Sequence, residues 1–471
     1  MQRWNGWGDD AVYMDLSPQA LKLLCELIGE GRVCPDYPLE KFLENMPEAR
    51  LSKHPLISFD AKLRLDHAHG QSMADWIGLR GGTLKRFPDG VSVPETVEEI
   101  HELLRFAAEQ NAVVIPYGGG TSVVGHLEVP QSERPVLCLS LERYNRLISI
   151  DIRSRLAVFE AGIRGPRLEQ QLNSKGFTLG HYPQSFEYSS LGGWVVTRSS
   201  GQQSKHYGRI EQLFAGGELL SPQGPLKLPA HPASAAGPDL RQLLLGSEGR
   251  MGVLTKAVVH IAAVPEKDVV YGVFFPSWEE ASQAVHAIAG TDIPFSMIRL
   301  SNPTETMTHL TLAGHEGQVA LLKRYLRLRG IHEKEACMCL IGFTGSRRIT
   351  SASRRAAFSI VRHHKGISLG KPMGNAWIKN RFYTAYLRNT LWDLGYAVDT
   401  LETAVNWDQV TPTMAAIEKS IHEALIPANE RAHVFSHLSH VYASGSSIYT
   451  TFLFRLLESP PKTFEAWQRI K

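Results

Sequence analysis

The chain has 471 residues, of which 43% are hydrophobic and 21% are charged, and its formal net charge is +3. This length allows two or three domains with ordinary cores. So small a charge argues against a nucleic-acid-binding surface and a polybasic membrane patch. No apolar run approaches the roughly 20 residues of a membrane-spanning helix, and the start, MQRWNGWGDD, predicts no secretory signal. Scattered cysteines without a C-x-x-C pair favour free thiols and a cytoplasmic protein.

Residues 1–85 are predicted to form a helical N-terminal arm. Ser17 followed by Pro18 is typical of a helix start, and apolar residues then recur at helical spacing as far as Gly29.

A β-α-β unit is predicted from about residue 86. Thr96 begins a capping box, the helix that follows ends near Asn111, and residues 112–115 form a short buried strand. The strand leads into the glycine-rich loop 116–125, PYGGGTSVVG. Consecutive glycines let the backbone approach a ligand, and successive amides can form a concave site for a phosphate or pyrophosphate. The alternative is a glycine-rich turn without a ligand. The P-loop pattern and the G-x-G-x-x-G spacing are both absent.

Two further glycine-rich segments follow. Residues 191–201 interleave Gly and Ser with Leu, Trp and Val, which favours backbone lying against a flat ligand over a disordered linker. Residues 246–255 form a third loop, which leads into a strand ending near Ile261.

The chain beyond Pro265 is predicted to be a second, α+β domain. Helical patterns near 278–290, 316–329 and 411–425 alternate there with short strands.

The three loops, in this order, resemble the FAD-binding domain of the vanillyl-alcohol oxidase / p-cresol methylhydroxylase (PCMH-type) flavoprotein superfamily. Within it the chain is most similar to the alkylglycerone-phosphate (alkyl-dihydroxyacetonephosphate) synthases. The segments that carry this closer match are Arg3–Asp9, Gly180–Tyr188, Thr197–Ser204, Tyr207–Ile210, Ile298–Asn302, Tyr386–Arg388 and Asp399–Thr403. The resemblance implies an α+β fold, with a two-subdomain PCMH-type FAD-binding domain at 86–265 and an α+β substrate or cap domain at 266–471.

FAD is the cofactor that this resemblance implies. The first loop would cradle the pyrophosphate, the second would line the flavin and ribityl chain, and the third would close the adenine and dimethylbenzene side. The implied cofactor-binding residues are Pro116, Tyr117, Gly118, Gly119, Gly120, Thr121, Ser122, Val123, Pro183, Ser189, Gly192, Gly193, Thr197, Ser200, Gly201, Glu248, Gly249, Val253 and Leu254. Some superfamily members bond FAD covalently through a histidine in the first loop. Gly120 and Thr121 occupy that place here, so non-covalent FAD is expected, with His126 as the alternative anchor.

The implied activity is unusual for a flavoprotein. In this family the acyl group of acyl-dihydroxyacetone phosphate is exchanged for a fatty alcohol through a flavin N5 adduct, in ether-lipid synthesis, without net redox change. Such chemistry needs a cation for the substrate phosphate and an acid/base group at the departing carboxylate. The matching catalytic positions are Arg299, Arg388 and Tyr449. Either arginine could instead pair with a carboxylate at a domain interface.

The chain departs from the family pattern at one place. The family carries a His-His-His-Gly-Val-Gly segment some tens of residues beyond the tyrosine, and the 471-residue sequence contains none. The substrate domain is therefore expected to be incomplete, and a truncated, catalytically silent flavin-binding protein is one alternative.

The second alternative is an FAD-linked oxidase or dehydrogenase of a 2-hydroxy acid such as D-lactate or glycolate. His440 would belong to that branch's metal strand, but no carboxylate follows it, and Tyr449 stands where a histidine would be wanted. His433, His437 and His440 could share one face of a helix. Their surroundings predict a strand, on which His440 would point away from the other two, so no metal is expected. Cys337 and Cys339 are predicted to be small apolar residues of another strand.

The expected partners are a small-molecule or lipid substrate and no nucleic acid. Peripheral membrane contact and a homodimer stay open, although no basic amphipathic helix is recognised in the sequence.

Overall fold

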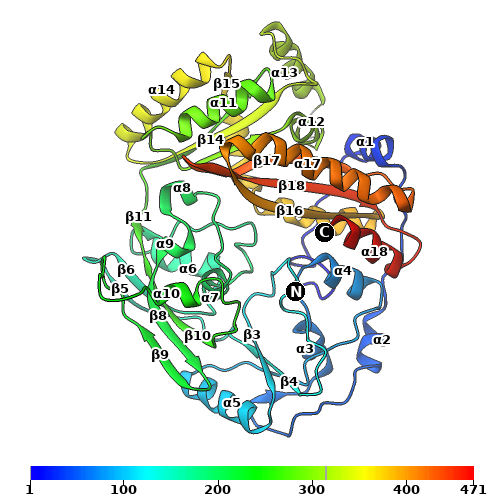
Figure 1. Ribbon diagram of the computed structural model, residues 1–471, viewed down its shortest axis with the longest axis vertical. Helices are drawn as coiled ribbons and strands as arrows, with labels where there is room; N and C mark the ends of the chain where they lie inside the picture. The colour runs from blue at the N-terminus through cyan, green and yellow to red at the C-terminus, as the bar shows by residue number, and fades with distance from the viewer. Residues whose placement is uncertain (1, 313–315) are drawn as a thin grey trace. The chain divides into compact units, whose positions relative to one another are not determined.

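The computed structural model describes residues 2–312 and 316–471, and its helices and strands are labelled in Figure 1. The chain divides into two compact units. The first unit consists of the residues up to Asp9, 35–201 and 207–264, and the second of 10–34, 202–206 and 265–471. The predicted N-terminal arm thus contributes residues to both units.

The first unit contains, among its described residues, a four-stranded sheet, a five-stranded sheet and one strand pair. The strand orders are β1-β2-β4-β3, β5-β6-β10-β8-β9 and β11-β7. The strands are β1 (Ile57–Ser58), β2 (Gly90–Ser92), β3 (Val113–Tyr117), β4 (Val136–Ser140), β5 (Leu147–Asp151), β6 (Leu156–Glu160), β7 (Phe177–Thr178), β8 (Phe214–Ser221), β9 (Gly224–Leu228), β10 (Val253–His260) and β11 (Ala262–Ala263). The helices are α2 (Leu39–Glu44), α3 (Ala61–Asp66), α4 (Met73–Arg80), α5 (Val97–Glu109), α6 (Gly165–Asn173), α7 (Leu191–Val196), α9 (Ile210–Leu213) and α10 (Arg241–Leu244).

The predicted β-α-β unit is present in β2, α5 and β3. Thr96 and Glu99 form the predicted capping box at the start of α5, in which the Thr96 hydroxyl accepts the Glu99 amide at 3.2 Å. Both β2 and β3 pair in parallel with the fully buried β4, as expected for a strand covered on both faces. Because β3 ends at Tyr117, the first glycine loop begins where a parallel strand stops, a common position for a ligand site.

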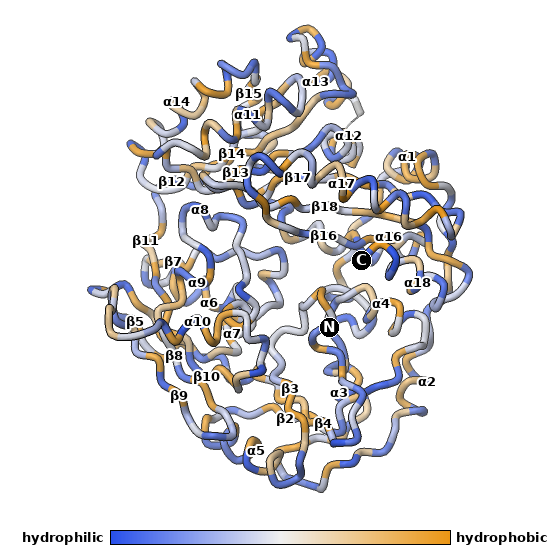
Figure 2. Tube along the Cα trace, viewed as in Figure 1, coloured by the Kyte–Doolittle hydropathy of each residue, from blue (hydrophilic) through white to orange (hydrophobic). Residues whose placement is uncertain are grey.

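The second glycine-rich segment is partly helical, which the sequence reasoning missed. Ser190 caps the hydrophobic helix α7 (Figure 2), and its hydroxyl accepts the Gly193 amide at 3.2 Å. The Gly192 amide donates to the Ala161 carbonyl at 2.7 Å, and a Cβ on Gly192 would lie 2.9 Å from the Ala161 Cβ. At least this glycine serves helix packing against the chain that follows β6.

The second unit is built on one seven-stranded sheet in the order β15-β12-β14-β13-β17-β18-β16. Its strands are β12 (Lys267–Phe275), β13 (Met297–Ser301), β14 (Cys337–Gly345), β15 (Ile367–Gly370), β16 (Tyr396–Asn406), β17 (His433–Val441) and β18 (Gly445–Arg455). Its helices are α1 (Pro18–Ile28), α11 (Trp278–Ala289), α12 (Pro303–Leu312), α13 (Glu316–Leu328), α14 (Arg347–His363), α15 (Pro372–Asn380), η1 (Tyr383–Tyr386), α16 (Leu387–Asp393), α17 (Trp407–Leu425), η2 (Ile426–Ala428) and α18 (Pro460–Ile470). The short α8 (Ser204–Tyr207) gives residues 204–206 to this unit.

The two faces of this sheet differ in character. Apolar side chains such as Ile341, Leu438 and Ile448 form the core with α11, α14 and α17 on one face. The opposite face packs in part against α12, α13 and α15 and carries Arg299 and His437. The predicted helices, and the strands predicted for 336–341 and 434–451, are therefore confirmed, as is the α+β class.

Candidate functional site

The first glycine loop presents a run of backbone amides that have no acceptor in the described part of the chain. From Gly118 to Val123 no amide donates a hydrogen bond, although the Ser122 carbonyl accepts the Gln71 amide at 2.6 Å. Gly119 and Gly120 are buried. Since buried amides in folded proteins are nearly always paired, this run is suited to an anionic ligand such as a pyrophosphate.

The glycines of this loop are also required by close packing against the segment before α7. A Cβ on Gly118 would lie 2.3 Å from the Ser190 hydroxyl, and one on Gly119 would lie 1.9 Å from the Tyr188 carbonyl oxygen. Gly120 has φ +66°, and a Cβ there would meet the Tyr117 hydroxyl at 2.1 Å. The structure thus brings the first two glycine-rich segments together.

The third loop lies against the other two. The Glu248 amide donates to the Val196 carbonyl at 2.9 Å, and a Cβ on Gly249 would approach Pro116 to 3.3 Å. His126 Nδ1 lies 3.2 Å from the Ser122 hydroxyl and 4.0 Å from a Glu248 carboxylate oxygen. The three loops therefore form one continuous region within the first unit.

Several predicted cofactor residues have polar groups that the protein itself satisfies. The Ser189 hydroxyl donates to the Ser185 carbonyl and accepts from Trp194 Nε1, at 2.9 and 2.7 Å. The Thr197 hydroxyl donates to the Gly193 carbonyl at 2.8 Å. The buried Tyr117 hydroxyl donates to the Asp66 and His69 carbonyls, and the Pro183 carbonyl accepts the Phe186 amide. Thr121 and Val123 lie in the first loop, and Ser200 and Gly201 follow α7. Val253 and Leu254 are buried at the start of β10.

On the second unit's sheet, Arg299 and His437 meet at a buried carboxylate. Glu305, on α12, is only 1% exposed. Its Oε1 lies 2.8 Å from Arg299 Nη2, 2.9 Å from His437 Nδ1 and 3.3 Å from His309 Nε2. Although burial opposes ionisation, the charge of Arg299 and the hydrogen bonds from His309 and His437 hold the pKa of the Glu305 carboxyl well below its ordinary value. The carboxylate therefore stays charged and holds Arg299 in place.

Tyr449 lies beside this cluster. Tyr449 is paired with His437 across β17 and β18, and the two rings are stacked with centroids 4.9 Å apart. Burial raises the pKa of the phenol, while burial and then the charge of Arg299 lower the pKa of His437 to about 4. Near neutral pH the phenol is protonated and the imidazole is uncharged, so Tyr449 can donate a proton or a hydrogen bond.

His440 was predicted to point away from His437, and that prediction is wrong. The pairing of β17 with β18 shifts register between Leu438 and Val441, and such a bulge re-aims the residues it contains. His440 Nε2 lies 4.0 Å from a carboxylate oxygen of Glu402, the residue paired with Tyr449 on β16. His437, Tyr449, Glu402 and His440 therefore share one face of the sheet.

The structure gathers two of the three predicted catalytic residues. Arg299 and Tyr449 both lie around His437, whereas Arg388 comes from α16, which packs on β16. Sequence reasoning missed Glu305, because nothing in its local pattern marks a partner 132 residues away.

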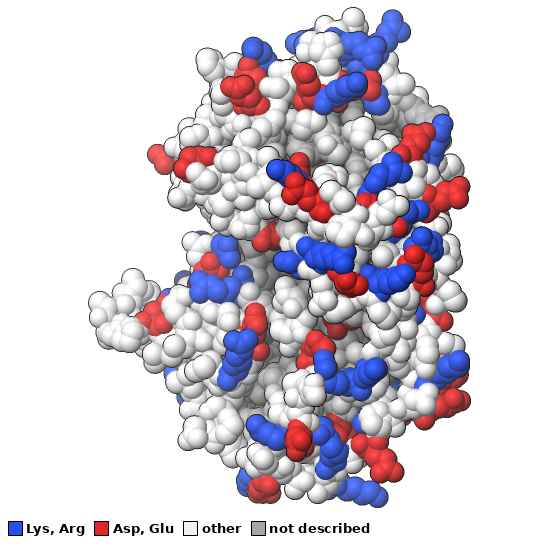
Figure 3. Space-filling model, turned by 45° about the vertical axis from the view of Figure 1, so that its right-hand side comes forward, with Lys and Arg blue, Asp and Glu red and all other residues white. Residues whose placement is uncertain are grey.

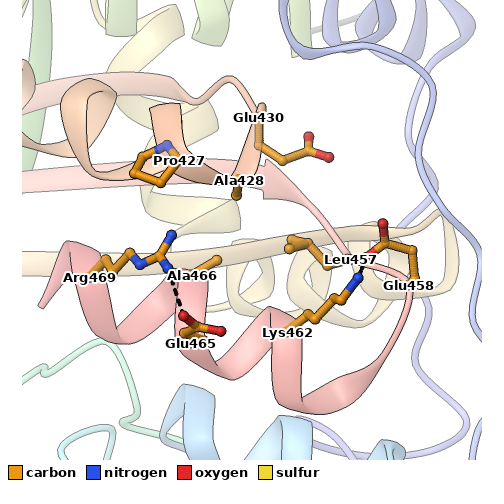
Figure 4. A pocket seen from close by; sticks show the side chains of 9 residues that line it. All are labelled: Pro427, Ala428, Glu430, Leu457, Glu458, Lys462, Glu465, Ala466 and Arg469. Atoms are coloured by element: carbon orange, nitrogen blue, oxygen red, sulfur yellow. Dashed lines mark hydrogen bonds and ion pairs between the residues drawn. The ribbon is translucent and has the colours of Figure 1, made fainter.

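A shallow pocket of about 260 Å³ lies elsewhere on the second unit, near α18 and η2. Its charged residues are largely paired with one another, Arg469 with Glu465 and Lys462 with Glu458 (Figure 4). The Glu430 carboxylate is ion-paired with Arg455. The pocket contains none of the predicted site residues, and we do not assign it to the reaction.

Both units match known families. Residues 88–227 match the model of the FAD binding domain, and residues 264–470 match that of the C-terminal domain of FAD linked oxidases. The alkyldihydroxyacetonephosphate synthase of Dictyostelium discoideum is 34% identical over 399 residues, which are 83% of this chain and 65% of that protein. A solved structure of an alkyldihydroxyacetonephosphate synthase matches with a TM-score of 0.89 and 29% identity, over 99% of this chain and 92% of that one. A p-cresol methylhydroxylase structure, at 12% identity and a TM-score of 0.64, shares the fold.

The first unit is thus a PCMH-type dinucleotide-binding fold, joined to a sheet domain of the flavin-linked oxidase kind. The chain carries matches to both domains of the FAD linked oxidases, and its predicted resemblance to alkyldihydroxyacetonephosphate synthases is confirmed. FAD is the cofactor, as predicted. The structure fits it, because the first loop offers amides, two of them on buried glycines, that have no acceptor among the described residues, where a pyrophosphate needs donors.

Gly119→Ala is expected to reduce FAD binding by roughly 5- to 150-fold, the equivalent of about 1–3 kcal/mol of overpacking. The added Cβ would have to displace the Tyr188 carbonyl, which lies 1.9 Å from its position. The measurement is flavin absorbance per protein, with the flavin released by acid precipitation, as expected for non-covalent FAD. Gly78→Ala is the control, since its Cβ would have 3.5 Å of space. Full flavin occupancy in Gly119→Ala would contradict the assignment.

Stability is expected to fall in mild acid because of His433. Burial, and then the charge of His422, lower the pKa of His433 to about 4, so the folded protein binds its proton later than the unfolded chain. The contribution of the uncharged His433 to the free energy of unfolding is complete above about pH 6.5. It is lost as the pH falls toward 4, by about 3 kcal/mol at most. Thermal melts between pH 7.5 and 5 should show a smaller loss in His433→Gln than in the parent. An equal loss of melting temperature in both proteins between pH 7.5 and 5 would count against this role of His433.

Proposed function

We propose that the protein is an FAD-dependent alkylglycerone-phosphate synthase-like enzyme, which exchanges the acyl group of acyl-dihydroxyacetone phosphate for a fatty alcohol. The observation that carries the proposal is the cluster of Arg299, Glu305, His437 and Tyr449 on one face of the second unit's sheet. It combines an anion-binding cation with a protonated phenol, and the predicted chemistry needs both. Similarity to the Dictyostelium synthase over 83% of this chain supports the substrate class.

Arg299 would bind the anionic part of the substrate. Glu305 occupies Nη2, and the structure gives Nε and Nη1 no partner among the described residues. The side chain is 22% exposed, so these N–H groups can reach a ligand, and guanidinium donors suit phosphate geometry. We further propose that Arg388, on α16, is a second anion donor.

Tyr449 would act on the departing carboxylate. In the exchange, the bond between the acyl oxygen and C1 of dihydroxyacetone phosphate breaks, and this carbon forms a bond to the alcohol oxygen. FAD, when bound, supplies the nucleophilic centre, and no net oxidation occurs. A phenol whose pKa is raised by burial keeps its proton near neutral pH, so it can hydrogen-bond the leaving oxygen and donate to it.

Tyr449→Phe is expected to lower the rate of exchange by about 10²- to 10⁴-fold, the usual scale for loss of an acid/base group. Palmitoyl-dihydroxyacetone phosphate and hexadecanol are the substrates, and the ether product and released palmitate are quantified. Tyr396→Phe is the matched control, because Tyr396 is a buried tyrosine of the same sheet whose hydroxyl donates to the Gly29 carbonyl instead. Unchanged exchange in Tyr449→Phe would remove this residue from the mechanism.

A parallel assay with D-lactate or glycolate and a dye acceptor tests the oxidoreductase alternative. Dye reduction by the parent protein without ether product would favour that activity. A flavin-loaded protein inactive in both assays would be the silent flavin-binding protein.

We also propose a peripheral membrane contact through α13. No helix in the described residues is long and apolar enough to cross a membrane, but Leu321, Tyr325 and Leu328 form an exposed stripe at i, i+4 and i+7. The adjacent side of the helix packs into the unit through Leu322 and Leu326. Basic side chains gather over this end of the molecule, at the top of Figure 3.

An anionic lipid surface suits this helix better than a neutral one. Arg324 lies beside the apolar stripe, and Arg329, just after the helix, places its guanidinium over the Tyr325 ring. Basic residues near such a surface contribute about 1 kcal/mol each. No basic amphipathic helix was recognised in the sequence, and α13 was therefore missed. A membrane site accords with a fatty substrate, and the free state of all five cysteines supports a cytoplasmic location.

Replacing Leu321 and Leu328 together by Asp is expected to weaken binding to vesicles that contain phosphatidylglycerol by more than tenfold, since each buried leucine stabilises by about 1.5–3 kcal/mol. Co-sedimentation measures the binding. Ile426→Asp is the control, because Ile426 is also 69% exposed but lies on η2. An equal loss in both variants, or none in the double variant, would refute the role of α13.

A further inference from the structure

The bulge in β17 places His440 between two polar partners. Its Nδ1 lies 3.4 Å from the Ser204 hydroxyl, and its Nε2 lies 4.0 Å from Glu402 Oε1. Ser204 also lies 3.3 Å from the Tyr442 hydroxyl, and the Ser447 hydroxyl donates to Glu402 at 3.0 Å. An imidazole is thus held at one nitrogen by a hydroxyl and faces a carboxylate at the other.

The register shift makes this arrangement possible. In an uninterrupted strand His440 would lie on the same face as Leu438, which is fully buried in the apolar core. The extra residue between Leu438 and Val441 keeps both of these in the core and turns His440 to the polar face, toward the residue paired with Tyr449. Bulges of this kind are frequent next to active sites, where they re-aim a side chain.

These two contacts indicate which proton transfers suit the imidazole. When Nδ1 donates its proton to the Ser204 hydroxyl, Nε2 carries the lone pair. At 4.0 Å the Glu402 carboxylate is too far to be hydrogen-bonded to Nε2, but its charge would stabilise a proton arriving there. His440 is 14% and Glu402 43% exposed at the side chain, so a ligand can reach this pair more readily than His437, at 5%.

We propose that His440 is a further catalytic residue, the base that accepts the proton of the incoming fatty alcohol, with Glu402 as its positioning residue. The inference rests on the proposed exchange. The alcohol O–H bond breaks, its electron pair stays on the oxygen that bonds to C1 of dihydroxyacetone phosphate, and the proton passes to Nε2. That proton balances the carboxylate released in the same turnover, so no oxidant or reductant is needed. Tyr449 serves the departing group, and His440 the entering one.

The test separates the two halves of the exchange in the flavin-loaded full chain. His440→Gln is expected to lower hexadecanol incorporation by about 100-fold or more, while palmitate release in a single turnover without alcohol stays within about threefold of the parent. A fatty alcohol made more acidic by fluorine substitution beside the hydroxyl-bearing carbon should recover part of the lost rate. Glu402→Gln should show the same split to a smaller degree. His433→Gln, a buried histidine of the same strand held by Thr308, is the control and should retain both rates.

Each other outcome overturns the proposal. An equal loss of both half-reactions in His440→Gln would assign His440 a structural role, and no loss would exclude it from the reaction. Bound metal in the parent, lost in His440→Gln, would make the residue a ligand. Absence of alkyl product from the flavin-loaded parent would refute the proposed function itself. This outcome is seen in the parent protein without any variant, so it is distinguished from a failure of the proposal for His440.

Discussion

One oxygen atom, Oε1 of Glu305, fixes the candidate substrate site. It lies 2.8 Å from Arg299 Nη2 and 2.9 Å from His437 Nδ1. The charge of Glu305 or of Arg299 would be costly to bury without the other. Because Arg299 and His437 lie on neighbouring strands and Glu305 on α12, the interaction joins sheet and helix. Asn302 strengthens the joint, since its side-chain oxygen accepts the Glu305 amide at 2.8 Å. The position of Arg299 is therefore set by the fold before any ligand binds.

The same cluster controls protonation. Arg299 and Glu305 cancel in charge, burial lowers the pKa of His437 to about 4, and burial raises the pKa of Tyr449. Near neutral pH these four side chains therefore carry no net charge. In the proposed exchange, an entering phosphate would be met by guanidinium N–H groups, and the leaving carboxylate by a neutral phenol. This suits a reaction that moves an acyl group and a proton without moving electrons between substrates.

Local patterns predicted much of the first unit. The capping box at Thr96, the strand into the loop and the glycines of residues 118–120 are properties of short segments, so the sequence specifies them directly. Helix α7 was missed because its two glycines weaken a helical pattern that Ser190 and packing on Ala161 restore. Glu305 and His440 were out of reach for another reason. The first depends on a partner 132 residues away, and the second on a register shift that only the pairing of β17 with β18 determines.

The number of glycines in a segment does not distinguish glycines that bind a ligand from glycines that allow close packing. The hydrogen-bond acceptor of each glycine amide does distinguish them. The Gly192 amide is used by the Ala161 carbonyl, and the Gly193 amide by the Ser190 hydroxyl. From Gly118 to Val123 the amides are unused by the described protein. The pyrophosphate donors should therefore be concentrated in the first loop, while α7 and its glycines hold that loop in shape. Since backbone amides rather than mobile cationic side chains would supply these donors, FAD affinity would depend on loop geometry, and a single added Cβ at Gly119 would disturb several donors at once.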